Sequence, residues 1–130
     1  PDKLVVSVSG DGCFLMNGQE IATAIQYNLK ILFIVFDNGM YGTIRMHQER
    51  DYPSHVYGTA LKNPDFAALA KAYGLHAETV TSTRDIRGAI KRCIDQNSAS
   101  LIHIKVDPEA ITTRTTLTAI RNKAMSENKA

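Results

Sequence analysis

Two short apolar runs mark the first part of the chain. Leu4–Val8 is rich in β-branched residues, and Ile31–Phe36 contains no polar residue at all. Such runs are typical of parallel strands that are covered on both faces. Between them, Gln19–Leu29 has helical periodicity and the length of a crossover helix. The pattern predicts a βαβ unit. The expected helical stripe consists of Ile21, Ala24, Ile25 and Asn28, with Ala22 and Leu29 alongside.

The second half of the chain alternates helical and strand patterns in the same way. Asn63 is the expected N-cap of a helix with Pro64 in its first turn, and Gly74 is the expected stop. The predicted buried stripe of this helix is Phe66, Leu69, Ala70 and Tyr73. Strands are expected at Leu75–Val80 and Leu101–Val106. Between these strands, Ser82–Asp85 resembles a capping box, and the apolar residues that follow at helical spacing are Ile86, Ala89, Ile90, Cys93 and Ile94.

The order of elements predicts an α/β fold, an open and mostly parallel sheet with helices on both faces. Residues 1–108 are expected to form one domain and residues 109–130 a terminal helix or tail. Thr43–Glu49 has helix-compatible residues, and Arg50–Lys62 lacks periodicity and is expected to be a loop. Because the chain opens without methionine, at Pro1-Asp2-Lys3 immediately before a predicted buried strand, we expect the domain to be incomplete at its N-terminus.

Two polar loops follow the two apolar runs of the βαβ unit. Gly10-Asp11-Gly12 follows the first run, and Asp37-Asn38-Gly39-Met40-Tyr41-Gly42 follows the second, with Asp11 and Asn38 27 positions apart. Either loop alone would be an ordinary turn. Together they are expected to open at the carboxyl ends of neighbouring or near-neighbouring strands, where open α/β sheets bind ligands. A carboxylate, an amide oxygen and a main-chain oxygen suit Mg²⁺ or Ca²⁺ rather than zinc, and flanking glycines allow a phosphate to approach.

Composition narrows the class of protein further. The 130 residues are 44% hydrophobic and 22% charged, with a net charge of +2 and scattered basic residues, which predicts neither nucleic-acid nor membrane binding. The two cysteines, Cys13 and Cys93, have no metal-ligand or CxxC spacing, which favours a reduced, cytoplasmic protein over a disulfide scaffold. Cys93 fits a core position, and His103, inside an apolar run, is expected to be a satisfied or half-exposed strand residue and not a catalytic base.

The two loops and the intervening Gln19-Glu20 resemble the cofactor motif of the thiamin-diphosphate-dependent enzymes, in the group of acetolactate synthase, benzoylformate decarboxylase and pyruvate oxidase. The resemblance covers nearly the whole chain and implies the C-terminal cofactor-binding domain. It implies that Asp11 and Asn38 bind Mg²⁺ through their side chains and Met40 through its main-chain oxygen. The residues that it places around thiamin diphosphate are Gly10, Asp11, Gly12, Cys13, Asn38, Met40, Tyr41 and Gly42.

Three residues depart from the family pattern. Cys13 stands where the family often has a serine, and Asp37 where it often has a second asparagine. The second change is expected to leave the metal ligands intact, because Asn38 carries that role. His47 stands near the place of a tryptophan that commonly lines the acceptor pocket of acetolactate synthases, which keeps a decarboxylase interpretation open.

The resemblance implies an enzyme, a transferase or lyase, that decarboxylates a 2-oxoacid and transfers the resulting acyl carbanion equivalent to a second carbonyl. The alternatives are a benzoylformate-decarboxylase-type lyase and a cofactor-binding fragment with no activity alone. In the family the activating glutamate comes from an N-terminal domain, usually of a partner subunit, so no catalytic residue is assignable here, and a homodimer or homotetramer with a shared site is expected. FAD often lies on a middle domain of such enzymes.

Other function classes have less support in the sequence. A cysteine enzyme would use Cys13 at a helix start with His47 or His55 as base, but no spacing fixes such a base. Neither GxGxxG nor GxxxxGK[ST] occurs, which argues against a nucleotide-binding module. A regulatory domain that shares the fold remains a third alternative.

Overall fold

The computed structural model describes residues 3–127 of the chain, and among these residues four strands form one parallel sheet. The strands are β1 (Val5–Gly10), β2 (Ile31–Asp37), β3 (His76–Val80) and β4 (Ser100–Lys105), in the order β1-β2-β4-β3. The helices are α1 (Asp11–Asn17), α2 (Ile21–Gln26), α3 (Gly42–Asp51), α4 (Phe66–Ala72), α5 (Thr83–Ile94) and α6 (Leu117–Glu127), with a 3₁₀ turn, η1 (Gly18–Glu20), between α1 and α2. The predicted α/β class with a parallel sheet is confirmed.

The chain divides into two compact units, which are described separately. The sheet unit comprises Pro1–Asp37 and Asn63–Lys105, and the helical unit comprises Asn38–Lys62 and Val106–Ala130. No helix in the described part of the chain is both long enough and apolar enough to cross a membrane.

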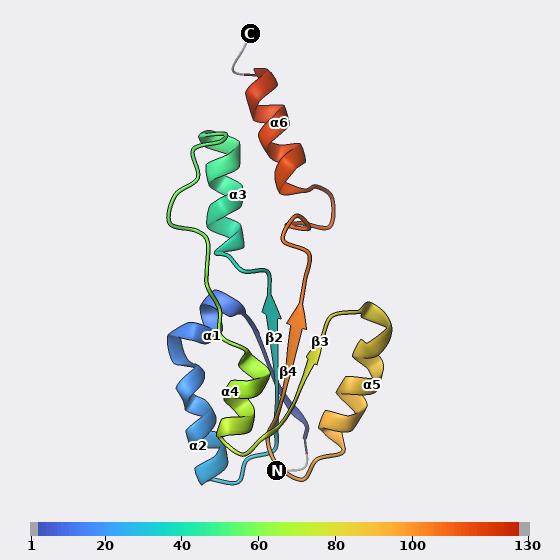
Figure 1. The fold of residues 1–130 in the computed structure, drawn as a ribbon. Helices are drawn as coiled ribbons and strands as arrows, with labels where there is room; N and C mark the ends of the chain where they lie inside the picture. The colour runs from blue at the N-terminus through green and yellow to red at the C-terminus, as the bar shows by residue number, and fades with distance from the viewer. Residues whose placement is uncertain (1–2, 128–130) are drawn as a thin grey trace. The chain divides into compact units, whose positions relative to one another are not determined.

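Helices cover both faces of the sheet, as predicted (Figure 1). Side chains of α1, α2 and α4 form one hydrophobic core with the strand residues Val35, Ala77 and Leu101. Helix α5 packs against β3 and β4 and buries Ala89 and Cys93. Because strand side chains alternate between faces, β4 is buried from Ser100 to Ile104, with each face under a helix. The prediction that Cys93 is a core residue is confirmed, and both cysteines are free.

Strand β1 differs from the expectation that it is covered on both faces. Val5, Val6 and Val8 are 52%, 44% and 63% exposed in the described part of the chain. The reason is its place in the sheet: among the described strands β1 pairs with β2 alone, and α5 lies at the other edge, over β3 and β4. Apolar composition predicted the strand correctly but could not predict which neighbours cover it.

The expected helical stripe between β1 and β2 is only partly right. Ile21 and Ala24 are buried, whereas Ile25 and Leu29 are 41% and 43% exposed. The helix ends near Tyr27, and Asn28 adopts a positive φ of 51° outside it. Asn28 and Leu29 lie beyond the end of α2 and therefore do not continue its helical periodicity. The crossover also begins earlier than predicted, since α1 starts at Asp11, directly after β1.

Helix α4 begins later than predicted and buries a different stripe. Its N-cap is Asp65, which accepts hydrogen bonds from Ala67 N and Ala68 N, so the prediction that Asn63 caps the helix is wrong. The buried positions are Phe66, Ala67 and Ala70, while Leu69 and Tyr73 are 36% and 38% exposed. Gly74, with a φ of 90°, follows the helix as the predicted stop.

The capping box predicted at the start of α5 is absent from the described hydrogen bonds of that helix. Ser82 is the N-cap residue, but its side chain makes no capping hydrogen bond; its Oγ accepts from Arg84 Nε at 3.1 Å. The Ser82 hydroxyl therefore hydrogen-bonds to the Arg84 side chain and not to a backbone N–H group in the first turn of α5.

The helical unit is built around the packing of α3 against α6. Helix α3 occupies the helix-compatible segment after Gly42, and α6 lies within the residues where a terminal helix or tail was expected. Glu49 on α3 has a fully buried side chain that accepts hydrogen bonds from Arg121 Nε and Nη2 at 2.7 and 2.5 Å and from Arg45 Nε at 3.0 Å. Arg121, helped by Arg45 and the backbone N–H of Ser54, lowers the pKa of Glu49 to about 2 against the burial that raises it.

Candidate functional site

The carboxyl ends of three parallel strands bring polar side chains to one edge of the sheet. Asp11 follows β1 directly, Asp37 is the last residue of β2, and Lys105 is the last residue of β4. The register pairs Gly10 with Phe36 and Asp37 with Lys105. Asp11 and Asp37 are both 3% exposed. This edge is where open α/β sheets bind ligands.

Asn63 connects the two buried carboxylates. Its Nδ2 donates to Asp11 Oδ2 and to Asp37 Oδ1, both at 2.7 Å. The other oxygen of Asp11 accepts from Gly12 N at 2.9 Å. Asp11, Asn63 and Asp37, which lie far apart in the sequence, therefore form one hydrogen-bonded group within the sheet unit.

Asp37 has further partners on β4. Lys105 Nζ and His103 Nε2 donate to its Oδ2 at 2.5 and 2.8 Å. A buried carboxylate is costly without a paired charge, and the ammonium of Lys105 supplies that charge. The aspartate at position 37 is therefore compensated by residues on the neighbouring strand.

His103 is fully buried, with an exposure of 1%, and is not half-exposed; its Nε2 is hydrogen-bonded to Asp37, whereas its Nδ1 has no hydrogen-bond partner among the described residues. Its ring packs edge-on against Phe66, with the ring centroids 5.0 Å apart. Its Nδ1 lies 3.6 Å from Asp65 Oδ1, beyond hydrogen-bond range. The ring therefore hydrogen-bonds to Asp37 through Nε2 and packs against the core residue Phe66.

Sequence reasoning missed Asn63, Asp37, His103 and Lys105 as members of this group. A signal was present: His103 and Lys105 are two positions apart, so they share one face of β4. This spacing predicts a contact with Asp37 only when the parallel register that pairs Lys105 with Asp37 is known. Nothing local in the sequence marked Asn63, whose partners lie 52 and 26 positions away.

The second predicted loop belongs to the helical unit. Asn38 follows Asp37 directly in the chain, and its Oδ1 accepts from Met40 N at 3.1 Å. Gly39 has a φ of 71°, which favours glycine. Tyr41 N donates to Thr59 O at 2.9 Å, and Leu61 N donates to Gly39 O at 2.8 Å. These bonds fix the loop that carries the predicted residues Asn38, Met40, Tyr41 and Gly42.

Gly42 is held to its residue type by close contacts. A Cβ there would lie 2.8 Å from both Asn38 Nδ2 and Ile111 Cδ1. We expect Gly42→Ala to displace Asn38 and to lower the free energy of unfolding by ~1–3 kcal/mol, the usual cost of overpacking. Urea unfolding followed by circular dichroism measures this.

Gly88→Ala in α5 is the matched control for that prediction. The nearest atom to its added Cβ is the guanidinium of Arg92, which can move, and alanine is the better helix former. The control should be neutral or stabilising. Equal destabilisation by both variants would contradict the steric account of Gly42.

The remaining predicted cofactor residues lie at the start of α1 in the sheet unit. Gly12 is buried, Cys13 is exposed, and an added Cβ at Gly10 would meet no atom within 4 Å. No packing contact of the described structure therefore requires a glycine at position 10, and the space beside it is open.

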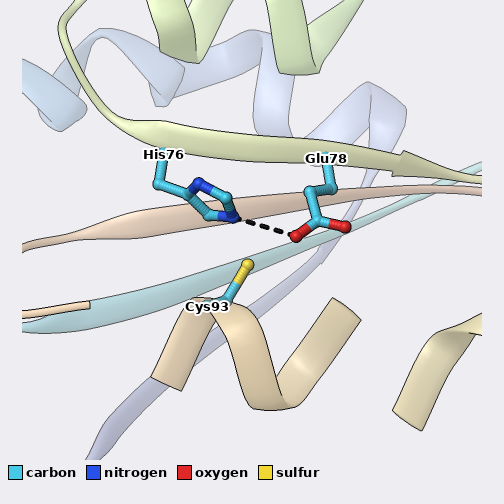
Figure 2. A group of neighbouring side chains, drawn as sticks. All are labelled: His76, Glu78 and Cys93. Atoms are coloured by element: carbon cyan, nitrogen blue, oxygen red, sulfur yellow. Dashed lines mark hydrogen bonds and ion pairs between the residues drawn. The ribbon is translucent and has the colours of Figure 1, made fainter. Parts of the chain in front are cut away.

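A second polar cluster, His76, Glu78 and Cys93, offers a nitrogen, an oxygen and a sulfur atom within 4.8 Å of one another (Figure 2). However, Arg92 Nε and Nη2 donate to the two oxygens of Glu78 at 2.8 and 2.6 Å. Chiefly through Arg92, the pKa of Glu78 falls to about 2, while burial raises the pKa of the Cys93 thiol. A guanidinium already neutralises the carboxylate and the sulfur is a neutral thiol, so the cluster is an ion-pair network and a poor metal site.

Comparison with known proteins shows the family to which the chain belongs. Residues 1–104 match the family model of the thiamine pyrophosphate enzyme, C-terminal TPP binding domain. A probable acetolactate synthase large subunit from Methanocaldococcus jannaschii is 36% identical over 109 residues, which cover 83% of this chain and 18% of that protein. A 3D-(3,5/4)-trihydroxycyclohexane-1,2-dione hydrolase from Bacillus subtilis is 34% identical over 119 residues, 86% of this chain and 18% of that protein.

A solved structure extends the comparison to the fold. The benzoylformate decarboxylase from Polynucleobacter necessarius superposes with a TM-score of 0.76 at 28% identity, over 83% of this chain and 20% of that one. The chain thus spans about a fifth of the length of the relatives it matches. The chain belongs to the thiamine pyrophosphate enzymes and corresponds to their C-terminal TPP-binding domain.

Proposed function

We propose that this chain is the cofactor-binding domain of an acetolactate synthase-like enzyme. The enzyme would decarboxylate a 2-oxoacid and transfer the resulting acyl carbanion equivalent to a second carbonyl. The observation that carries the proposal is the hydrogen-bonded group of Asp11, Asn63 and Asp37 at the carboxyl edge of the sheet. It fixes a buried carboxylate where ligands of such sheets bind, in a chain 36% identical to a probable acetolactate synthase large subunit.

The donor set fits Mg²⁺ and a diphosphate. Asp11 offers carboxylate oxygens, Asn38 an amide oxygen that retains a lone pair beside its bond to Met40 N, and Met40 a main-chain oxygen. Oxygen ligands of this kind suit Mg²⁺, which completes its shell with water and phosphate oxygens.

The residues of this chain would hold and orient the cofactor. Asp11, Asn38 and Met40 would bind the metal that anchors the diphosphate, and the open space beside Gly10 would admit the phosphate. Cys13, Tyr41 and Gly42 would border it. When bound, thiamin diphosphate supplies the nucleophilic carbon and the electron sink for decarboxylation. Glu20 accepts from Thr23 Oγ1 at 2.8 Å and is exposed, so we assign it a structural role at the start of α2.

The rest of the site would come from outside this chain. We propose that the complete enzyme is a homodimer or homotetramer, with the activating glutamate contributed by an N-terminal domain of a partner subunit. FAD on a middle domain and a cytoplasmic location belong to the same proposal. The isolated chain should bind the cofactor weakly and turn over no 2-oxoacid.

A second candidate is a non-oxidative 2-oxoacid decarboxylase. It is favoured by the fold match to a benzoylformate decarboxylase and by His47, an exposed residue of α3, near the place of the acceptor-pocket tryptophan. The two candidates differ in whether a second oxoacid accepts the two-carbon unit or a proton releases an aldehyde.

Product analysis separates these functions. The full-length enzyme is incubated with pyruvate, thiamin diphosphate and Mg²⁺, and acetolactate and acetaldehyde are quantified. The proposal predicts acetolactate as the main product. Acetaldehyde alone would support the decarboxylase, and no cofactor-dependent consumption of pyruvate or of a panel of other 2-oxoacids would contradict both.

A further inference from the structure

Asn63 makes an unusual pair of contacts for a residue in the segment before α4. One side-chain nitrogen donates to two carboxylates, Asp11 Oδ2 and Asp37 Oδ1, at 2.7 Å each. Helix capping is done by Asp65 instead. The position of Asn63 is therefore set by the carboxylates at the sheet edge and not by the needs of the helix.

The orientation of the amide group follows from the charges around it. The NH₂ group faces two carboxylate oxygens, whereas the opposite orientation would place an oxygen lone pair against both of them. Asn63 Oδ1 is buried and has no hydrogen-bond partner among the described residues. A buried unpaired carbonyl is costly, so the two charge-assisted bonds of the NH₂ group outweigh that cost.

These contacts hold the Asp11 carboxylate in one orientation. Asn63 fixes Oδ2, and Gly12 N fixes Oδ1 at 2.9 Å, while each carboxylate oxygen can accept more than one bond. Asp37 is fixed in turn by Lys105 and His103 on β4, so it serves as a rigid support for Asn63. The chain of contacts runs from β4 through Asp37 and Asn63 to Asp11.

We propose that Asn63 is a positioning residue that orients Asp11 for the divalent metal ion. Asp37 supports Asn63 and is not itself a metal ligand in this proposal. This inference rests on the proposed function, in which Asp11 is a metal ligand. Residues that hydrogen-bond to a metal ligand pre-orient it, and their loss typically weakens metal binding 10–100-fold. Asn63 would therefore act on the Mg²⁺ affinity and leave the chemistry at saturating Mg²⁺ largely unchanged.

The test is an Mg²⁺ titration of thiamin-diphosphate binding by the full-length apoenzyme, followed by calorimetry. Asn63→Ala should raise the half-saturating Mg²⁺ concentration at least about tenfold. The turnover number at saturating Mg²⁺ should change much less. Asn63→Ser, whose shorter hydroxyl cannot reach both carboxylates, should give the same result and serves if the alanine variant folds poorly.

Ser100→Ala is the matched control, because it removes a buried hydrogen bond of the same unit, from Ser100 Oγ to Cys93 O at 3.1 Å, that involves none of Asn63, Asp11, Asp37 and His103. It should lower the thermal midpoint of the apoenzyme without changing the Mg²⁺ requirement. Asn63 variants with an unchanged Mg²⁺ requirement, or one changed no more than in Ser100→Ala, would overturn the positioning role. Cofactor binding by the wild type that is independent of Mg²⁺ would overturn the proposed function itself, and with it this role.

Discussion

Replacing Asp11 with alanine is expected to abolish Mg²⁺-dependent retention of thiamin diphosphate by the full-length enzyme. Asp11 is the only charged residue among the three proposed metal ligands, and its carboxylate is buried and held by Asn63 and Gly12. Residues that merely orient a ligand account for ~10–100-fold in metal affinity, so the loss of the ligand should exceed a hundredfold. Cofactor content after dialysis against Mg²⁺-containing buffer measures the effect.

Asp95→Ala is a suitable control for Asp11→Ala. Asp95 is an exposed carboxylate in the same unit, paired only to Lys91 in the described contacts, at 2.7 Å. Surface pairs of this kind contribute little to stability, so the control should retain the cofactor like the wild type. Full retention by Asp11→Ala after dialysis would exclude Asp11 as the anchoring ligand.

Replacing Glu49 with alanine is expected to lower the free energy of unfolding by ~3 kcal/mol at neutral pH, because it leaves the Arg45 and Arg121 side chains without their shared buried carboxylate. The effect should depend on pH. The pKa of Glu49 is lowered from 4.5 to about 2 in the folded protein, so its stabilising contribution is complete above pH 4.5 and is lost as the pH falls towards 2. Urea unfolding at pH 7 and pH 3 measures both the size and the pH dependence.

Asp51→Ala, on the same helix, is the control for Glu49. Asp51 is exposed and pairs with the exposed Arg50, so its loss should change the free energy of unfolding much less than the loss of Glu49. If the difference between wild type and Glu49→Ala stayed constant from pH 7 to pH 3, the buried ion pairs would not be the source of the stabilisation.

The elements that sequence predicted best are those with local causes. The apolar runs became β1, β2 and β4, and Gly74 ended α4 because a positive φ is a local property of glycine. The exposure of Val8 and Leu69 was not predictable in this way, since it depends on which element packs against each face. Periodicity gives the type of element more reliably than its neighbours.

The residues of the candidate site also differ in whether a local sequence signal marks them. Asp11 and Asn38 were recognisable because each sits in a loop of characteristic residues after an apolar run. Asn63 was predicted to be a helix cap because asparagine is a good cap residue, but its two bonds to distant carboxylates determine its place. Tertiary contacts of this kind leave no periodic or motif signal in one sequence.

The aspartate at position 37 also gains an explanation. A second asparagine is common there in the family, and a buried carboxylate would ordinarily be unfavourable. Lys105 and His103 donate to Asp37, and Asn63 joins it to Asp11. The negative charge of Asp37 is thus compensated by Lys105, and Asp37 supports Asn63, which in turn contacts the proposed metal ligand Asp11.

The most direct test of the central claim is a crystal structure of the full-length enzyme with thiamin diphosphate and Mn²⁺, which replaces Mg²⁺ and is located by its anomalous scattering. The account predicts one metal peak bound by the side chains of Asp11 and Asn38, the main-chain oxygen of Met40 and the diphosphate. A metal peak and a diphosphate bound without Asp11 and Asn38 would contradict it.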